Sequence, residues 1–186
     1  MLSELVKMDY DLIFIGGSPG SGKTTVSKLL YGRLDHPPLV DFGILREPHL
    51  ERDWSNWSRK EESMAFENLV FMLKNYARNG YRNVIVNDLQ DHRVRQIPKR
   101  FSGLRYIIIS LVVDDDKELK RRVLGERDSG FKDVKAALDW NRKLIKRKAV
   151  KNEFKLDNAH GNPNATVERI IELMNGTGRG TKSRKR

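Results

Sequence analysis

Residues 17–24 have the types and the spacing of a loop that binds phosphate. The segment reads GSPGSGKT and matches the pattern G-x-x-x-x-G-K-[ST] at every fixed position. Glycines let successive backbone N–H groups converge on an anion, and a helix that begins directly after the loop adds a favourable dipole. In such a loop Lys23 can reach the β- and γ-phosphates of a nucleotide, and the Thr24 hydroxyl can ligate Mg²⁺. The residues expected to contact the nucleotide are Gly17, Ser18, Gly20, Ser21, Gly22, Lys23, Thr24 and Thr25.

The segments on either side of the loop support this interpretation. An apolar run at residues 11–15 has the character of a buried strand, and a helical stretch covers residues 23–34. The alternative is a glycine-rich turn that binds nothing, but such a turn does not require a strand before it and a helix after it. The motif and its context together predict a site for ATP with Mg²⁺.

Strands and helices alternate along the rest of the chain. Further strands are expected at 39–41, 84–88, 106–113 and 154–156, and further helices at 58–80, 115–127, 132–150 and 164–174. The run YIIISLVV at 106–113 is apolar almost throughout, as a strand covered on both faces should be. Alternation of this kind indicates a layered α/β domain with a parallel sheet. We therefore expect a three-layer α/β/α domain over residues 1–175, with a central, mostly parallel five-stranded sheet.

Composition narrows the classes of protein further. The chain has 186 residues and no cysteine, which excludes a disulfide scaffold, a thiolate zinc site and cysteine catalysis, and which favours a cytoplasmic location. The formal charge of +11 invites a nucleic-acid hypothesis. However, six lysines and arginines lie at 142–151 and five at 176–186, and neither segment contains an acid. We therefore expect a neutral domain with two basic segments, the second being a disordered tail over residues 176–186.

The phosphate loop and the order of elements resemble those of the small P-loop kinases over about residues 10–175. This group includes the nucleoside-monophosphate kinases, gluconate kinase and chloramphenicol phosphotransferase. The GTPase branch fits less well, because the sequence has neither the guanine-reading Asn-Lys-x-Asp segment nor an Asp-x-x-Gly switch. The resemblance implies phosphoryl transfer from Mg-ATP, a short helical lid, and an acceptor site at the carboxyl ends of the strands.

Roles for three residues follow from the resemblance, and two more residues are candidates by their position. In these kinases an acid after the second strand can accept the proton of the substrate's hydroxyl group, and an arginine on the next helix grips the acceptor's anionic group. This implies Asp41 as general base and Arg46 as substrate clamp, the alternatives being a helix N-cap and a surface ion pair. Asp88, after the third strand, would hold Mg²⁺ directly or through water, or would serve only as a cap. Gln90 and Arg93 are further candidates for contact with the acceptor.

The segment 121–131 resembles the lid of these kinases, whose arginines close over the donor phosphates. The resemblance implies that Arg127 enters the site on closure, where its charge would offset that of the transferring phosphoryl group. Arg122 would cap the adenine, and the alternative for this segment is a solvated basic helix face. Residues 158–163 lie where related kinases line the adenine pocket.

These residues predict an ATP-dependent phosphotransferase that moves the γ-phosphoryl group to a small-molecule acceptor, such as a nucleoside, a nucleotide or another hydroxyl compound. The alternative is a polynucleotide 5′-hydroxyl kinase, or a nucleotide-gated ATPase that binds nucleic acid or protein, in which the basic segments hold phosphates. No strand with interleaved aromatic residues and no recognised nucleic-acid fold supports this alternative. The placement of the charge therefore favours ATP over a long polyanion, and no membrane partner is expected.

Overall fold

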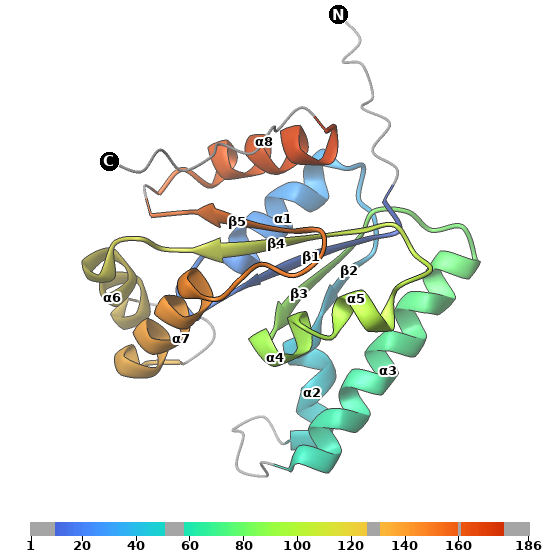
Figure 1. The fold of residues 1–186 in the computed structure, drawn as a ribbon, viewed down its shortest axis with the longest axis horizontal. Helices are drawn as coiled ribbons and strands as arrows, with labels where there is room; N and C mark the ends of the chain where they lie inside the picture. The colour runs from blue at the N-terminus through green and yellow to red at the C-terminus, as the bar shows by residue number, and fades with distance from the viewer. Residues whose placement is uncertain (1–9, 51–57, 126–130, 160, 177–186) are drawn as a thin grey trace, which may run out of the picture.

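The computed structural model describes residues 10–50, 58–125, 131–159 and 161–176. Its centre is a sheet of five strands in the order β2-β3-β1-β4-β5 (Figure 1). The strands are β1 (Leu12–Gly17), β2 (Leu39–Asp41), β3 (Val84–Leu89), β4 (Tyr106–Val112) and β5 (Glu153–Asp157). Every pair of neighbouring strands is parallel, so the predicted layered α/β fold is confirmed with a sheet that is parallel throughout.

Helices cover both faces of this sheet. α1 (Lys23–Arg33) and α8 (Pro163–Met174) pack on one face, whereas α3 (Arg59–Arg78), α4 (Asp91–Val94) and α5 (Ile97–Arg100) pack on the other (Figure 1). α2 (Phe42–Leu50) continues directly from β2 and packs on α3. α6 (Asp116–Leu124) and α7 (Val134–Lys146) pack on each other. The starts of α2, α4 and α6 therefore follow the carboxyl ends of β2, β3 and β4.

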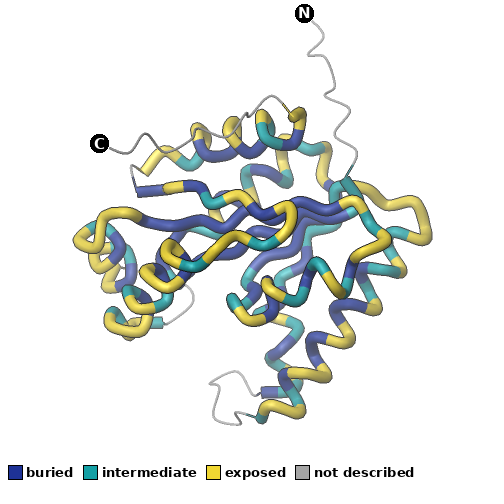
Figure 2. Tube along the Cα trace, in the orientation of Figure 1, coloured by how far each residue is buried: buried dark blue, intermediate teal, exposed yellow. Residues whose placement is uncertain are grey.

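The pleat of the strands gives the sheet a core on each side. Along β1, Leu12 and Phe14 face the layer of α3, whereas Ile13 and Ile15 face α1 and α8. Each of these four side chains is at most 1% exposed. Figure 2 shows the central strands buried along their length between exposed outer helix faces. Burial on both faces explains why the sequence of β4 is apolar almost without interruption.

The basic segment 142–151 differs from the helix predicted for it. α7 ends at Lys146 and does not continue to residue 150. Arg147 leaves the helical conformation with ψ 151°, and its guanidinium donates to Asp91 Oδ1 at 2.7 Å and to Glu153 at 2.6 and 2.7 Å. These two carboxylates lie on α4 and β5, so the pairing draws the chain away from the helix axis. The segment is thus divided between a helix end and a loop.

Two short helices were not predicted, and two predicted features cannot be compared. The sequence gives no sign of α4 and α5, because four residues are too few to display helical periodicity. Residues 126–130 of the predicted lid segment 121–131, and residues 177–186 of the predicted tail 176–186, lie outside the described residues. No helix in the part of the chain that the structure describes is long and apolar enough to cross a membrane.

Candidate active site

The loop between β1 and α1 has a backbone that only glycine adopts easily. Gly20 and Gly22 have φ angles of 89° and 93°. A Cβ on Gly22 would lie 2.6 Å from Asn158 Nδ2, and one on Gly20 would lie 2.8 Å from Leu119 Cδ1. The loop therefore needs these glycines both for its conformation and for the close approach of its neighbours.

The same loop leaves polar groups without partners in its interior. Ser18 and Ser21 are fully buried, and their Oγ atoms have no hydrogen-bond partner among the described residues. Buried hydroxyls are normally satisfied, so these two are exceptional, and they lie in a loop that ends at the N-terminus of α1, where the helix dipole favours an anion. The cradle therefore fits the phosphates of a nucleotide, as the motif predicts.

A side chain from the far end of the chain holds this loop in place. Asn158 Nδ2 donates to the Ser21 carbonyl at 2.8 Å, and Asn158 Oδ1 accepts from the Thr166 hydroxyl at 2.7 Å. Asn158 comes from the end of β5, and Thr166 from α8. The resemblance placed residues 158–163 near the adenine, but nothing in the sequence indicated this contact with the loop itself.

The lysine of the loop lies beside the acid that ends β3. Lys23 Nζ donates to the Ser18 carbonyl at 3.1 Å and lies 3.7 Å from Asp88 Oδ1. Asp88 Oδ2 in turn accepts from Arg46 Nη2 at 2.9 Å. The Arg46 side chain is only 6% exposed, and its guanidinium stacks 5.0 Å from the centroid of the Phe42 ring. The structure thus brings three predicted site residues together, with Arg46 paired to Asp88 and buried.

Asp41 forms the cap of α2 at the edge of this group. Its Oδ1 accepts from the backbone N–H of Gly43 at 2.8 Å and of Ile44 at 3.3 Å. Burial, and next the negative charge of Asp88, raise the pKa of Asp41 above its ordinary value, although the two N–H donors act against this. The cap that the sequence offered as an alternative is therefore present, and it leaves a carboxylate whose affinity for a proton is increased.

Gly43 separates the two carboxylates, and sequence reasoning did not single it out. A Cβ at this position would lie 2.8 Å from Asp88 Oδ2 and 2.9 Å from Asp41 Oδ1. Gly43 is the second residue of α2, so its backbone is helical and would accept a side chain. What the glycine provides here is space for the two acids.

The oxygen donors at this point fit a magnesium ion. Thr24 is exposed on the first turn of α1, and the Asp88 side chain is 41% exposed. Within the described ranges no group of three or more His, Cys, Asp or Glu residues could hold a metal. Mg²⁺ usually takes only one or two protein carboxylates and completes its shell with water and substrate phosphates, so the absence of a larger cluster does not conflict with the predicted ligands Thr24 and Asp88.

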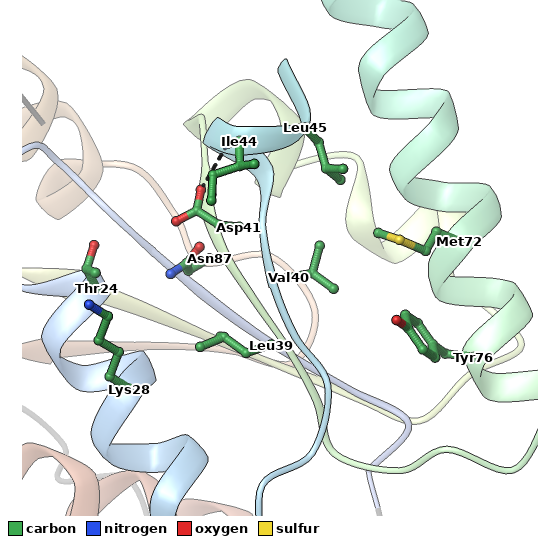
Figure 3. Close-up of a pocket in the computed structure, with 10 residues that line it drawn as sticks. All are labelled: Thr24, Lys28, Leu39, Val40, Asp41, Ile44, Leu45, Met72, Tyr76 and Asn87. Carbon is green, nitrogen blue, oxygen red and sulfur yellow. Dashed lines mark hydrogen bonds between the residues drawn. The ribbon is translucent and has the colours of Figure 1, made fainter. Parts of the chain in front are cut away.

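A pocket of about 440 Å³ opens beside these residues (Figure 3). Thr24 and Lys28 approach it from α1, and Met72 and Tyr76 approach it from α3 on the other side of β2. The complete lining is Thr24, Lys28, Leu39, Val40, Asp41, Ile44, Leu45, Met72, Tyr76 and Asn87. The volume lies in the range of small-molecule sites, which is about 300–1,000 Å³.

Comparison with solved structures finds chains of the same architecture. A putative kinase from Chloroflexus aurantiacus j-10-fl has a TM-score of 0.63 at 20% identity, over 89% of this chain and 96% of the other. A gluconokinase from Sinorhizobium meliloti 1021 has a TM-score of 0.63 at 15% identity, over 88% and 90%. Thymidylate kinase from Candida albicans has a TM-score of 0.62 at 15% identity, over 90% and 92%. This chain has the fold of the small P-loop kinases.

The likeness is one of fold, and it confirms the resemblance at that level. No protein-family model and no curated protein matches the sequence. The roles of individual residues in this P-loop fold therefore depend on the geometry of the chain itself.

Two residues that were predicted to contact the acceptor, Arg93 and Gln90, do not line the pocket. Arg93 is buried between α3 and α4, where it pairs with Glu62, donates to Ser63 Oγ at 3.0 Å, and stacks 4.5 Å from the centroid of the Phe66 ring. Gln90 precedes α4, and its carbonyl accepts from the N–H groups of the first turn. Neither residue is among those that line the pocket beside the P-loop.

The arginines assigned to the lid are described only in part. Arg122 Nη2 donates to the Ala159 carbonyl at 2.8 Å, and Arg122 Nε donates to Glu118 Oε1 at 2.7 Å. It therefore ties α6 to the loop after β5, next to the Asn158 contact with the P-loop. Arg127 lies outside the described residues, so its predicted role on closure stays a prediction.

Proposed function

We propose that this protein is an ATP-dependent phosphotransferase that acts on a hydroxyl group of a small molecule. The observation that carries the proposal is that the P-loop and the pocket share a boundary. Thr24 follows the loop lysine and also lines the pocket. Asp41, at the end of β2, lines the same pocket. A γ-phosphoryl group held by the loop would therefore lie beside a carboxylate and an open volume. The shared fold with a gluconokinase and a thymidylate kinase supports the same class of reaction.

The loop would bind the donor. Its backbone N–H groups suit the phosphates of ATP, and Lys23 would offset their charge. Thr24 and Asp88 would hold Mg²⁺, which would neutralise charge on the β- and γ-phosphates. These residues account for binding and orientation of the donor.

The acceptor would enter from the pocket side. Its hydroxyl oxygen forms a bond to the γ-phosphorus, the bond from that phosphorus to the bridging oxygen breaks, and ADP leaves with the bridging oxygen. The proton of the hydroxyl group passes to Asp41, whose raised pKa brings its proton affinity closer to that of an effective base near neutral pH. Arg46 would keep Asp88 in position beside this group.

The direct test is an assay of ADP release over a panel of hydroxyl compounds. The proposal expects ADP formation that depends on the acceptor and that falls at least about a hundredfold in Lys23→Ala, because the lysine would contact the transferring group. Lys99→Ala is the matched control, since Lys99 is exposed on α5 and lies outside the pocket lining. Binding of ATP without turnover on any acceptor would overturn the proposal.

A further inference from the structure

Asp88 lies between two cations of the protein itself. Its Oδ1 is 3.7 Å from Lys23 Nζ, and its Oδ2 accepts a hydrogen bond from Arg46 Nη2 at 2.9 Å. The two cationic side chains are only 10% and 6% exposed, whereas that of Asp88 is 41% exposed. The charge of this carboxylate is therefore balanced from the interior, while its outer side remains open to solvent.

The strand that carries Asp88 has an extra residue at this point. The register of β3 with β1 includes Asn87 and Leu89 but passes over Asp88. The backbone of Asp88 has φ 59°, a left-handed conformation that aspartate adopts more readily than most residues. A bulge of this kind turns a side chain out of the ladder, and here it directs the carboxylate to the two cations.

A second carboxylate lies beside the first. Asp41 Oδ1 and Asp88 Oδ2 are 2.9 and 2.8 Å from one point, which is the position that a Cβ on Gly43 would take. Two negative charges this close repel each other, and a neighbouring cation offsets the repulsion. Arg46 donates to the same Oδ2 atom that faces Asp41. With Lys23, the two acids and the two cations together carry no net charge.

The balance of charge at this point bears on the affinity for a divalent cation. That affinity depends on how much negative charge the ligands of the cation carry. A neutral group attracts a divalent cation weakly, and the phosphates of a bound nucleotide would supply the negative charge that the group lacks. Even at the dielectric constant of water, removing one positive charge about 5 Å from a divalent cation changes its affinity about tenfold.

From these observations we infer that Arg46 keeps Asp41 and Asp88 from binding a divalent cation until the phosphates of the nucleotide are present. This inference rests on the proposed function, in which Asp88 is a ligand of Mg²⁺. Arg46 is a positioning residue in this role, because it acts through the charge and the orientation of Asp88. The metal then enters the site together with the nucleotide and not before it.

Thermal unfolding tests this inference without an acceptor. Arg46→Met removes the charge and keeps an unbranched side chain against the Phe42 ring. It should melt about 4–8 °C below the wild type, because it leaves two neighbouring carboxylates with one cation fewer. Adding about 10 mM MgCl₂ should restore at least about 2 °C relative to NaCl of equal ionic strength. The wild type should shift by less than about 1 °C with MgCl₂ alone, and by more only when ATP is also present.

Three further variants separate a role in metal binding from a role in the fold. Arg93→Met is the matched control, since Arg93 is also buried, pairs with Glu62 and stacks on a phenylalanine ring. It should lose stability that MgCl₂ does not restore. Arg46→Gln keeps a donor for Asp88 and is the milder change, yet it should respond to MgCl₂ as Arg46→Met does. Adding Asp88→Asn to Arg46→Met should abolish the response.

The contrary outcomes are specific to this inference. A response of the wild type to MgCl₂ alone that equals the response of Arg46→Met would overturn it, as would an equal response in Arg93→Met. Failure of both Arg46 variants to respond, or a response that survives Asp88→Asn, would also overturn it. All these outcomes leave the proposed function intact. Absence of ADP release with every acceptor would instead overturn the proposed function, and the melting temperatures would still decide whether Arg46 controls the metal.

Discussion

Replacing Gly43 by alanine should impair catalysis without harming the fold. A Cβ at this position would lie 2.8 Å from Asp88 Oδ2 and 2.9 Å from Asp41 Oδ1. Ordinary contact begins near 3.4 Å, so each carboxylate oxygen would have to retreat by roughly 0.5 Å. Both atoms are at the ends of short side chains, so the displacement falls on these two carboxylates and on the contacts that hold them, which are the N–H donors of α2 for Asp41 and Arg46 for Asp88.

The expected effect on the free energy of unfolding is small, whereas the expected effect on kcat is large. Alanine in a helix is more stable than glycine by about 0.5–1 kcal/mol, which offsets part of any weakening of the Asp41 cap. The weakened bond from Arg46 to Asp88 counts against stability, so the free energy of unfolding should fall by no more than about 1–2 kcal/mol. A displacement of about half an ångström in the base and its neighbour should lower kcat by about tenfold, since a 1 Å misplacement can cost about a hundredfold.

The experiment pairs Gly43→Ala with Gly32→Ala. Gly32 lies in the last turn of α1, and a Cβ there would meet nothing within 4 Å. The control should gain about 0.5–1 kcal/mol in stability and keep its activity. Thermal unfolding and initial rates of ADP release measure the two effects. A Gly43→Ala enzyme with wild-type kcat would refute the reasoning, because the close approach of the carboxylates would then be irrelevant to the reaction.

Two further predictions concern the supports of the site. Asn158→Ala leaves the Ser21 carbonyl and the Thr166 hydroxyl without their buried partner, so it should destabilise the protein by about 1–3 kcal/mol and weaken ATP binding several-fold. Denaturant unfolding and titration with ATP measure this, with Asn164→Ala as control, and unchanged ATP affinity would refute the role of Asn158 as a support of the loop. Glu153 is buried, which acts to raise its pKa, but hydrogen bonds from Arg147 and Ser110 outweigh burial and lower that pKa. Its ion pair should therefore be fully present above the ordinary carboxyl pKa and be lost as the pH falls through the lowered pKa of Glu153, so Glu153→Gln should cost about 2–3 kcal/mol at pH 7 and much less once the pH is below that lowered pKa. Urea unfolding across this pH range measures the difference, and a cost independent of pH would contradict the assignment.

The parts of the site that the sequence predicted depend on residues close together in the chain. The loop from Gly17 to Thr24 could be identified because its strand, its glycines and its helix are contiguous. The cap formed by Asp41 could also be anticipated, since its partners are two and three residues away.

The parts that the sequence did not predict join residues that are distant in the chain. Asn158 meets Ser21 across 137 positions, and Arg46 meets Asp88 across 42. Whether an arginine reaches a substrate or an internal carboxylate depends on the order of strands in the sheet, and no local pattern reports that order. Arg93 illustrates this, because its position after β3 suggested the acceptor site, whereas Glu62 on α3 holds it in the interior.

The basic segment 142–151 shows the same limit for charge. Its six cations look like one positive face in the sequence. In the structure Arg147 belongs to an internal network with Asp91 and Glu153, and of the other five cations only Arg142, Lys143 and Lys146 lie on α7. Net charge is a sum over the chain, and it does not distinguish charges that face solvent from those that hold elements together.

The most direct test of the central claim is to follow the γ-phosphoryl group itself. The protein and Mg-ATP labelled in the γ-phosphate are incubated with each compound of the hydroxyl panel, and the products are separated and counted. The account predicts that the label appears on at least one acceptor in amounts equal to the ADP formed, and that Lys23→Ala lowers this transfer at least about a hundredfold. Label found only in inorganic phosphate, or only in ATP across the whole panel of hydroxyl acceptors while ATP still binds, would contradict it.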